Sequence, residues 1–194
     1  MKKIFLDCGT HLCEGLKDFI NKGILTKEFE VHTFEANPSC NIKERIKTLP
    51  IQVTAHEKAV WVKDGTIFFN QENHTKSGSG SPNDGTSNID GWGSSIEGIG
   101  FIHPGYETKV EVESISFSNF IEKLPEDSLI ICKMDIEGSE FRVLRDLIDN
   151  DTITKINEIY VEFHERFMPE ESLETRNELI SIIESKGVKV HQWF

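Results

Sequence analysis

The pattern of apolar and polar positions is clearest over residues 130–141, IICKMDIEGSEF. The apolar run at its start indicates a strand buried on both faces. From Phe141 onward, apolar residues recur at spacings of three and four, which predicts a helix. Asp135 and Glu137 stand at the junction, where open α/β sheets bind their ligands. In a second interpretation Glu137 and Ser139 only favour the helix start, but Asp135 is then unexplained.

The same pattern predicts strands that alternate with helices along the whole chain. The strands are expected at 3–8, 29–34, 51–55, 59–62, 66–69, 110–113, 129–134, 156–163 and 188–193. The helices are expected at 12–20, 39–48, 117–124, 141–148 and 173–185. Asp64-Gly65 predicts a hairpin between strands 59–62 and 66–69. This order indicates an α/β fold, with one domain over residues 1–194 and a doubly wound, mainly parallel sheet flanked by helices.

One long segment, residues 70–105, has no periodicity and is rich in Gly, Ser and Asn. Such a segment in a compact domain is usually functional or disordered. A flexible linker would not need the apolar side chains of Trp92 and Phe101. We therefore expect a loop that is mobile without ligand and closes over a site.

Composition narrows the classes of function. The chain has 194 residues, with 21 basic and 33 acidic side chains and a net charge of −12. This acidity argues against non-specific binding to nucleic acid and to anionic membranes. No apolar run reaches the roughly 18 residues of a membrane span. The four cysteines form no C-x-x-C pair and predict a reducing, cytoplasmic setting.

Polar residues follow the first two predicted strands in a pattern that suits a nucleoside. Asp7 and Gly9 end the first strand, and Glu35 ends the second, 35 − 7 = 28 positions later. An acidic residue at the end of the second strand is how such folds hold a ribose diol. A nicotinamide cofactor normally needs a G-x-G-x-x-G turn, and here only Gly9 and Gly15 are available. A ligand with a ribose and no phosphate fits better, which points to S-adenosylmethionine.

Taken in order, the segments LDCGTHLCEGL, TFEANPS, EKAVW, KMDIEGSEF and VEFHE resemble the FkbM-type family of S-adenosylmethionine-dependent methyltransferases. The resemblance runs from about Ile4 to His164, and its most specific block is Lys133 to Glu140. It implies a Rossmann-like class I methyltransferase fold, S-adenosylhomocysteine as product, and methylation of hydroxyl groups, mostly of sugars or polyketide-type products. The expected function is O-methylation of a sugar or glycan.

The chain departs from the usual class I pattern in two places. The first loop carries His11 and Cys13 where small or amide residues are common. The sequence also stops at Phe194, which leaves little room for the antiparallel last strand of that fold and fits a domain of a longer polypeptide.

The resemblance and the strand ends together give a set of expected cofactor contacts. Lys58 and Ala59 follow the third strand, where class I folds contact the adenine. Ser95, with Ser94, could hydrogen-bond the cofactor carboxylate or the acceptor. The full expected set is Asp7, Gly9, Thr10, His11, Glu35, Ala36, Asn37, Lys58, Ala59, Ser95 and Asp135.

The expected catalytic residues are His164, Asp135 and Glu162. His164 is the candidate general base, because histidine titrates near neutral pH, and Glu162 precedes it on the same face. Asp135 would orient the acceptor or the cofactor amine. A divalent ion, magnesium or manganese, is a further option with Asp135, Glu137 and Glu162 as oxygen ligands.

The other histidines carry less weight. His32 and His56 are expected to be structural, and His103 is an optional contact to the acceptor.

Two other classes of function stay open at this point. One is an N-methyltransferase acting on a small metabolite or nucleic acid, although the signature Asp/Asn-Pro-Pro-Tyr/Phe is absent. The other is a non-catalytic nucleotide-binding module, which the intact set Asp7, Glu35 and Asp135 disfavours.

Overall fold

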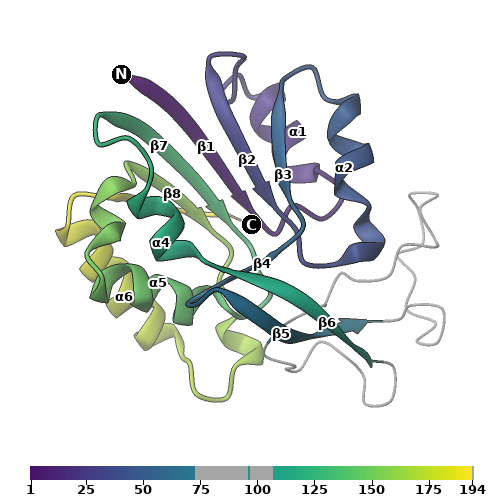
Figure 1. The fold of residues 1–194 in the computed structure, drawn as a ribbon. Coiled ribbons are helices and arrows are strands. Elements are labelled where there is room, and N and C mark those ends of the chain that lie inside the picture. The colour runs from purple at the N-terminus through teal and green to yellow at the C-terminus, as the bar shows by residue number, and fades with distance from the viewer. Residues whose placement is uncertain (73–95, 97–106, 194) are drawn as a thin grey trace.

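The computed structural model describes residues 1–72, 96 and 107–193. Its main sheet has six parallel strands in the order β3-β2-β1-β7-β8-β9 (Figure 1). The strands are β1 (Lys2–Cys8), β2 (Phe29–Phe34), β3 (Val53–His56), β7 (Ser128–Met134), β8 (Glu158–Val161) and β9 (Lys189–Gln192). The expected α/β fold, with helices flanking a parallel sheet, is confirmed.

Helices cover both faces of this sheet. Figure 1 shows α4, α5 and α6 gathered on one side and α1 and α2 on the other. The helices are α1 (Glu14–Asn21), α2 (Ile42–Arg45), α4 (Phe117–Glu122), α5 (Glu140–Asp149) and α6 (Leu173–Ser185). Short 3₁₀ turns lie at Pro38–Cys40, Ile46–Thr48, Thr152–Lys155 and Glu165–Phe167.

The alternation of side chains along the central strand β1 explains the two cores. Ile4, Leu6 and Cys8 point toward α4, α5 and α6, whereas Phe5 points toward α1. Asp7 has the same parity as Phe5, so its carboxylate is also on the α1 face. In β7 the residue in register with Asp7 is Lys133. Two charged residues therefore lie side by side at the buried centre of the sheet.

A second, three-stranded sheet has the order β4-β6-β5, formed by β4 (Ala59–Trp61), β6 (Glu107–Ser116) and β5 (Gly65–Glu72). The prediction of a hairpin between β4 and β5 is wrong. Strand β6 lies between them, parallel to β4 and antiparallel to β5. The turn instead docks on the end of β6: the Ser116 amide donates to Asp64, and the Ser114 hydroxyl donates to the Lys63 carbonyl.

Several expected boundaries also change. The helix expected at 39–48 is two 3₁₀ turns around α2, because Asn37 caps the first turn and Asn41 adopts a left-handed conformation before α2. Strand β8 ends at Val161, so Glu162 and His164 follow the strand. The last strand, β9, pairs parallel to β8. Ser95 and most of the Gly/Ser-rich segment, with Trp92, Phe101 and His103, lie outside the described residues.

Candidate active site

A cavity of about 410 Å³ opens at the carboxyl ends of β1, β2 and β7. Strands β1 and β7 are neighbours at the centre of the sheet, and the strand order runs outward from them in opposite directions. This is the topological switch point at which open α/β sheets bind their ligands. The cavity therefore lies where both the sequence and the topology predict it.

The buried carboxylate of Glu35, after β2, is held in place by two backbone amides. The His11 amide donates to Glu35 Oε2 at 2.6 Å, and the Asn37 amide donates to Oε1 at 2.7 Å. Burial raises the pKa of Glu35, and these two hydrogen bonds oppose the rise. Each carboxylate oxygen has further lone pairs, and Glu35 lines the cavity. It can therefore accept hydrogen bonds from a diol without moving.

Lys133 connects the ends of β1 and β7. Its ammonium donates to the Gly9 carbonyl at 2.7 Å and lies 3.2 Å from Asp135 Oδ2 and 3.6 Å from Asp7 Oδ1. Burial alone would lower the pKa of Lys133, but Asp135 and Asp7 raise it. Lys133 is therefore a buried cation shared by two carboxylates, as burial of these charges requires.

Asp7 lies beneath the cavity wall, not in it. It is 1% exposed, and burial raises its pKa. Among the described residues, its Oδ1 has no hydrogen-bond partner. Gly15 packs close to both groups, since a Cβ there would lie 3.7 Å from Asp7 Oδ1 and 3.5 Å from Lys133 Cε. Asp7 can thus supply negative potential to a cation bound in the cavity without lining the cavity itself.

The loops after β1 and β7 meet in close contact. Gly9 has φ +75°, and a Cβ at this position would lie 1.7 Å from the Asp135 carbonyl oxygen. The Asp135 amide in turn donates to the Cys8 carbonyl at 3.1 Å. Gly9 is therefore required by the approach of one backbone to the other.

The loop after β7 has an unusual backbone. Glu137 has φ +54° and Gly138 has φ +98°, and a left-handed conformation costs a residue with a Cβ roughly 1–2 kcal/mol. The side chain of Glu140, the first residue of α5, stabilises this loop. Glu140 Oε1 accepts the Ile136 amide at 2.7 Å, and Oε2 accepts the Gly138 amide at 3.0 Å. The two amides on either side of Glu137 are thus held by one carboxylate.

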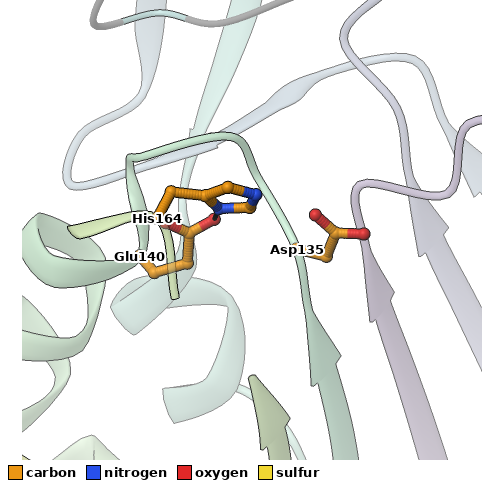
Figure 2. A group of neighbouring side chains, drawn as sticks. All are labelled: Asp135, Glu140 and His164. Atoms are coloured by element: carbon orange, nitrogen blue, oxygen red, sulfur yellow. Dashed lines mark hydrogen bonds and ion pairs between the residues drawn. The ribbon is translucent and has the colours of Figure 1, made fainter. Parts of the chain in front are cut away.

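His164 packs behind the cavity wall and is 3% exposed. Its Nδ1 lies 3.1 Å from Glu140 Oε1, and its Nε2 lies 3.6 Å from both Glu137 Oε2 and Glu162 Oε1. Figure 2 shows the imidazole ring lying against the Glu140 carboxylate, with Asp135 beyond the ring. Because both Glu140 oxygens already accept backbone amides, we assign the Nδ1 proton to this hydrogen bond.

The pKa values of His164, Glu137 and Glu162 are all raised, so these side chains hold their protons to higher pH than usual. Burial alone would lower the pKa of His164, but the hydrogen bond to Glu140 and the charges of Glu140, Glu137 and Asp135 raise it to about 9. Burial raises the pKa of Glu137 to about 9, although His164 opposes this rise. Burial also raises the pKa of Glu162.

The arrangement does not fit the expected metal site. Within the part of the chain that the structure describes, the potential ligand atoms that lie within 4.8 Å of one another belong to Asp135, Glu140 and His164. The expected set of Asp135, Glu137 and Glu162 is not brought together in this way. Glu140 already accepts hydrogen bonds from the Ile136 and Gly138 amides and from His164, so a metal ion would compete with these contacts for its oxygens.

Most of the expected contact residues line the cavity. Those in its wall are Gly9, Thr10, His11, Glu35, Ala36, Lys58, Ala59, Asp135, Glu137 and Glu162. Asn37 and His164 lie outside the wall, and Asn37 contributes the amide that holds Glu35. His32 and His56 stack on each other at the sheet edge, 5.3 Å between ring centroids, which agrees with a structural role.

The sequence reasoning missed several residues of the site. Lys133 and Glu140 both belong to the block Lys133–Glu140, so the motif had marked them, but it assigned them no function. The apolar part of the wall is formed by Phe34, Val60, Phe69, Ile96, Ile136 and Trp193, with Glu14 and Gly15 nearby. These residues come from distant parts of the chain, and periodicity gives no signal for their convergence.

Comparison with known proteins agrees with this geometry. Residues 7–190 match the FkbM methyltransferase domain. This chain belongs to the FkbM methyltransferase family. The match covers nearly the whole chain, including all the cavity residues named above except Trp193, and supports methyl transfer as the activity. No curated protein and no solved structure gives a significant match to this FkbM-family chain. None of its described helices is both long and apolar enough to cross a membrane.

Proposed function

We propose that this FkbM-family chain is an S-adenosylmethionine-dependent O-methyltransferase that methylates a hydroxyl of a sugar or glycan. The observation that carries the cofactor assignment is the Glu35 carboxylate, which is oriented by the amides of His11 and Asn37 and faces the cavity. Buried carboxylates held in this way are suited to the two hydroxyls of a ribose.

The remainder of the wall suits the other parts of S-adenosylmethionine. Phe34, Val60 and Phe69 form an apolar surface near Glu35 that can pack against an adenine ring. On the opposite side, Asp135, Glu137 and Glu162 provide negative potential for the sulfonium and the ammonium of the methionine moiety. No phosphate subsite is required.

The acidic wall also favours a neutral acceptor. Asp135, Glu137 and Glu162 can accept hydrogen bonds from sugar hydroxyls, but they would repel a phosphate placed beside them. The net charge of −12 acts in the same direction over the whole surface. We therefore favour an uncharged sugar unit over nucleic acid as the methyl acceptor.

The chemistry then depends mainly on alignment. The acceptor oxygen forms a bond to the methyl carbon while the carbon–sulfur bond breaks and its electron pair stays on sulfur. The hydroxyl proton must leave at the same time to a base of the protein. The chain contributes orientation of the two reactants and a dry, negatively charged wall beside the methyl group.

Calorimetry with S-adenosylhomocysteine tests the cofactor assignment. We expect Glu35→Ala to lose about 30-fold or more in affinity, equivalent to about 2 kcal/mol. Glu35→Gln should lie between the wild type and Glu35→Ala, because its amide oxygen can still accept one amide hydrogen bond. The exposed Glu28→Ala serves as the matched control. Unchanged affinity in Glu35→Ala, or no binding by the wild type, would contradict the proposal.

A transfer assay with methyl-labelled S-adenosylmethionine tests the acceptor class. The panel comprises neutral methyl glycosides and oligosaccharides, sugar nucleotides, small amines and RNA. Label in an ether linkage to a neutral sugar is the expected result. Transfer to an amine or to RNA would favour the N-methyltransferase alternative. Tight binding of the cofactor without transfer to any member would favour a nucleotide-binding module.

A further inference from the structure

We propose that Glu137 is the catalytic residue that faces the transferred methyl group and accepts the proton of the acceptor hydroxyl, and that Glu140 and His164 hold it in position. This inference rests on the function proposed above. It moves the general base from His164, where the sequence placed it, to a residue in the cavity wall.

Accessibility separates these candidates. His164 and Glu140 are 3% and 0% exposed and do not line the cavity. A general base must come within hydrogen-bond reach of the proton that it accepts. The wall carboxylates Glu137 and Glu162 stand between His164 Nε2 and the cavity, each 3.6 Å from that nitrogen. An acceptor would thus meet a carboxylate before it met the imidazole.

Among the three wall carboxylates that follow β7 and β8, Glu137 is positioned by the most elaborate local structure. Asp135 is already engaged in an ion pair with the Lys133 ammonium, 3.2 Å from its Oδ2. Glu162 simply follows β8, with its amide bonded to the Met134 carbonyl. Glu137 instead has a left-handed backbone, and the amides on both sides of it are bound by Glu140.

Such backbone strain persists only where surrounding contacts enforce it, and it concentrates at functional sites. Here the enforcing contacts are specific to the loop that carries Glu137. Glu140 binds this loop and also orients His164, whose other nitrogen faces the Glu137 carboxylate. Met168 packs against Gly138 on the far side, where a Cβ would lie 2.8 Å from its sulfur. The loop is therefore held from two sides with the Glu137 carboxyl group in the cavity wall.

The balanced step is as follows. The acceptor oxygen attacks the methyl carbon, the carbon–sulfur bond breaks toward sulfur, and the hydroxyl proton moves to the Glu137 carboxylate. The sulfonium cation and the Glu137 anion are both neutralised. The charged groups that face Glu137 are Asp135, Glu140, Glu162 and His164, and burial keeps its pKa high, so it binds the proton firmly. The positive sulfonium favours its ionised form before reaction.

Sinefungin provides a test that needs no acceptor. This analogue carries a primary ammonium where S-adenosylmethionine carries the transferred methyl group, so the ammonium reports on the facing carboxylate. We expect the ratio of sinefungin affinity to S-adenosylhomocysteine affinity to fall about tenfold or more in Glu137→Gln, the loss of one charge-assisted hydrogen bond. In Glu162→Gln the ratio should change by about threefold or less.

The ratio also separates the two proposals. If the wild type does not bind S-adenosylhomocysteine, the proposed function fails. If it binds and the ratio is unchanged in Glu137→Gln, or falls further in Glu162→Gln than in Glu137→Gln, the assignment of Glu137 fails and the cofactor assignment survives. Because both affinities are measured on the same variant, a partly unfolded sample lowers both and leaves their ratio intact.

The same ratio tests the positioning residues. His164→Leu should lower it without changing the affinity for S-adenosylhomocysteine, because Glu137 loses its orienting group. His164→Gln should recover part of the ratio, since its amide can take over one hydrogen bond of the ring. Glu140→Gln should behave like His164→Leu. A purely structural role would lower stability in all three variants and leave the ratio at the wild-type value, which would overturn this part of the inference.

Discussion

Each carboxylate around the cavity has a different compensating partner. Glu35 is bound by two backbone amides, Asp135 by the Lys133 ammonium, and Glu140 by the loop that follows β7. Glu137 faces His164, and the pKa values of both groups are raised. One chemical group thus supports a loop in the structure and, in the function proposed above, also binds a diol and accepts a proton.

Among these residues, Lys133 is the one whose substitution we expect to lower the free energy of unfolding most. Lys133→Met keeps the length of the side chain but leaves Asp7 buried without its countercharge, which should cost about 3 kcal/mol or more in free energy of unfolding. Urea denaturation measures this. Adding Asp7→Asn to Lys133→Met should restore part of the loss, whereas Lys43→Met, in an exposed pair with Glu57, should cost less than about 0.5 kcal/mol. A loss in Lys133→Met no larger than in the control would contradict the pairing.

The protons held by His164 and Glu137 predict how stability depends on pH. Their folded pKa values of about 9 exceed the unfolded values of 6.5 and 4.5, so the folded state binds more protons across this range. The stability contributed by each retained proton should therefore decrease with rising pH, from about pH 4.5 for Glu137 and from about pH 6.5 for His164, in both cases up to about pH 9. The slope is up to roughly 1.4 kcal/mol per pH unit for each retained proton. Thermal denaturation of the ligand-free protein measures the slope. Glu137→Gln should flatten it, and an identical slope in that variant would contradict the raised pKa of Glu137.

The sequence identified the residue types of the site better than their roles. Asp135, Glu35 and His164 follow recognisable strands, so their place at one sheet edge could be predicted. The burial of His164 and the hydrogen bonds from the loop to Glu140 could not be predicted, because both depend on the conformation of the five-residue loop between β7 and α5. Left-handed φ angles at Glu137 leave no trace in the hydrophobic pattern.

At the level of the elements, the loops after β1 and β7 touch at Gly9, where a Cβ would lie 1.7 Å from the Asp135 carbonyl oxygen. Gly9→Ala should therefore destabilise the protein well beyond the roughly 1 kcal/mol expected for a left-handed glycine, and it should abolish binding of S-adenosylhomocysteine. Gly23→Ala is the matched control, since Gly23 has φ +71° and a Cβ there would meet nothing within 4 Å. Circular dichroism melts and calorimetry of both variants measure the difference. Equal effects at the two glycines would show that conformation alone, not the approach to Asp135, sets the requirement.

Hydrophobic periodicity predicted the strands of the main sheet, but the predicted strand pairing in the three-stranded sheet was wrong. The Asp64-Gly65 turn is a local signal for a hairpin between β4 and β5, but β5 pairs with β6 instead. Strand β6 lies between β4 and β5, with three residue pairs to β4 and eight to β5. That pairing involves residues about fifty positions apart, so no local pattern could have shown it.

For the whole molecule, the order of the strands predicts a gradient of stability. Strands β1 and β7 have a strand on each side and helices over both faces, whereas β3 and β9 are at the edges. We expect amide hydrogens of β1 and β7 to exchange only on global unfolding and those of β9 to exchange about tenfold faster or more. Native-state hydrogen exchange at low denaturant measures this. Equal protection of β9 and β1 would indicate that the sheet unfolds as one unit.

The cavity wall extends along the chain from Gly9 to Trp193, whose ring stacks on Phe19 of α1 at 4.9 Å. During synthesis, the cavity wall is therefore complete only after β9 and the tryptophan that follows it have left the ribosome. A nascent chain that stops short of β9 would have Glu35 and Asp135 in place but no closing aromatic ring. Under the function proposed above, we expect cofactor capture to be a late event in the life of each molecule.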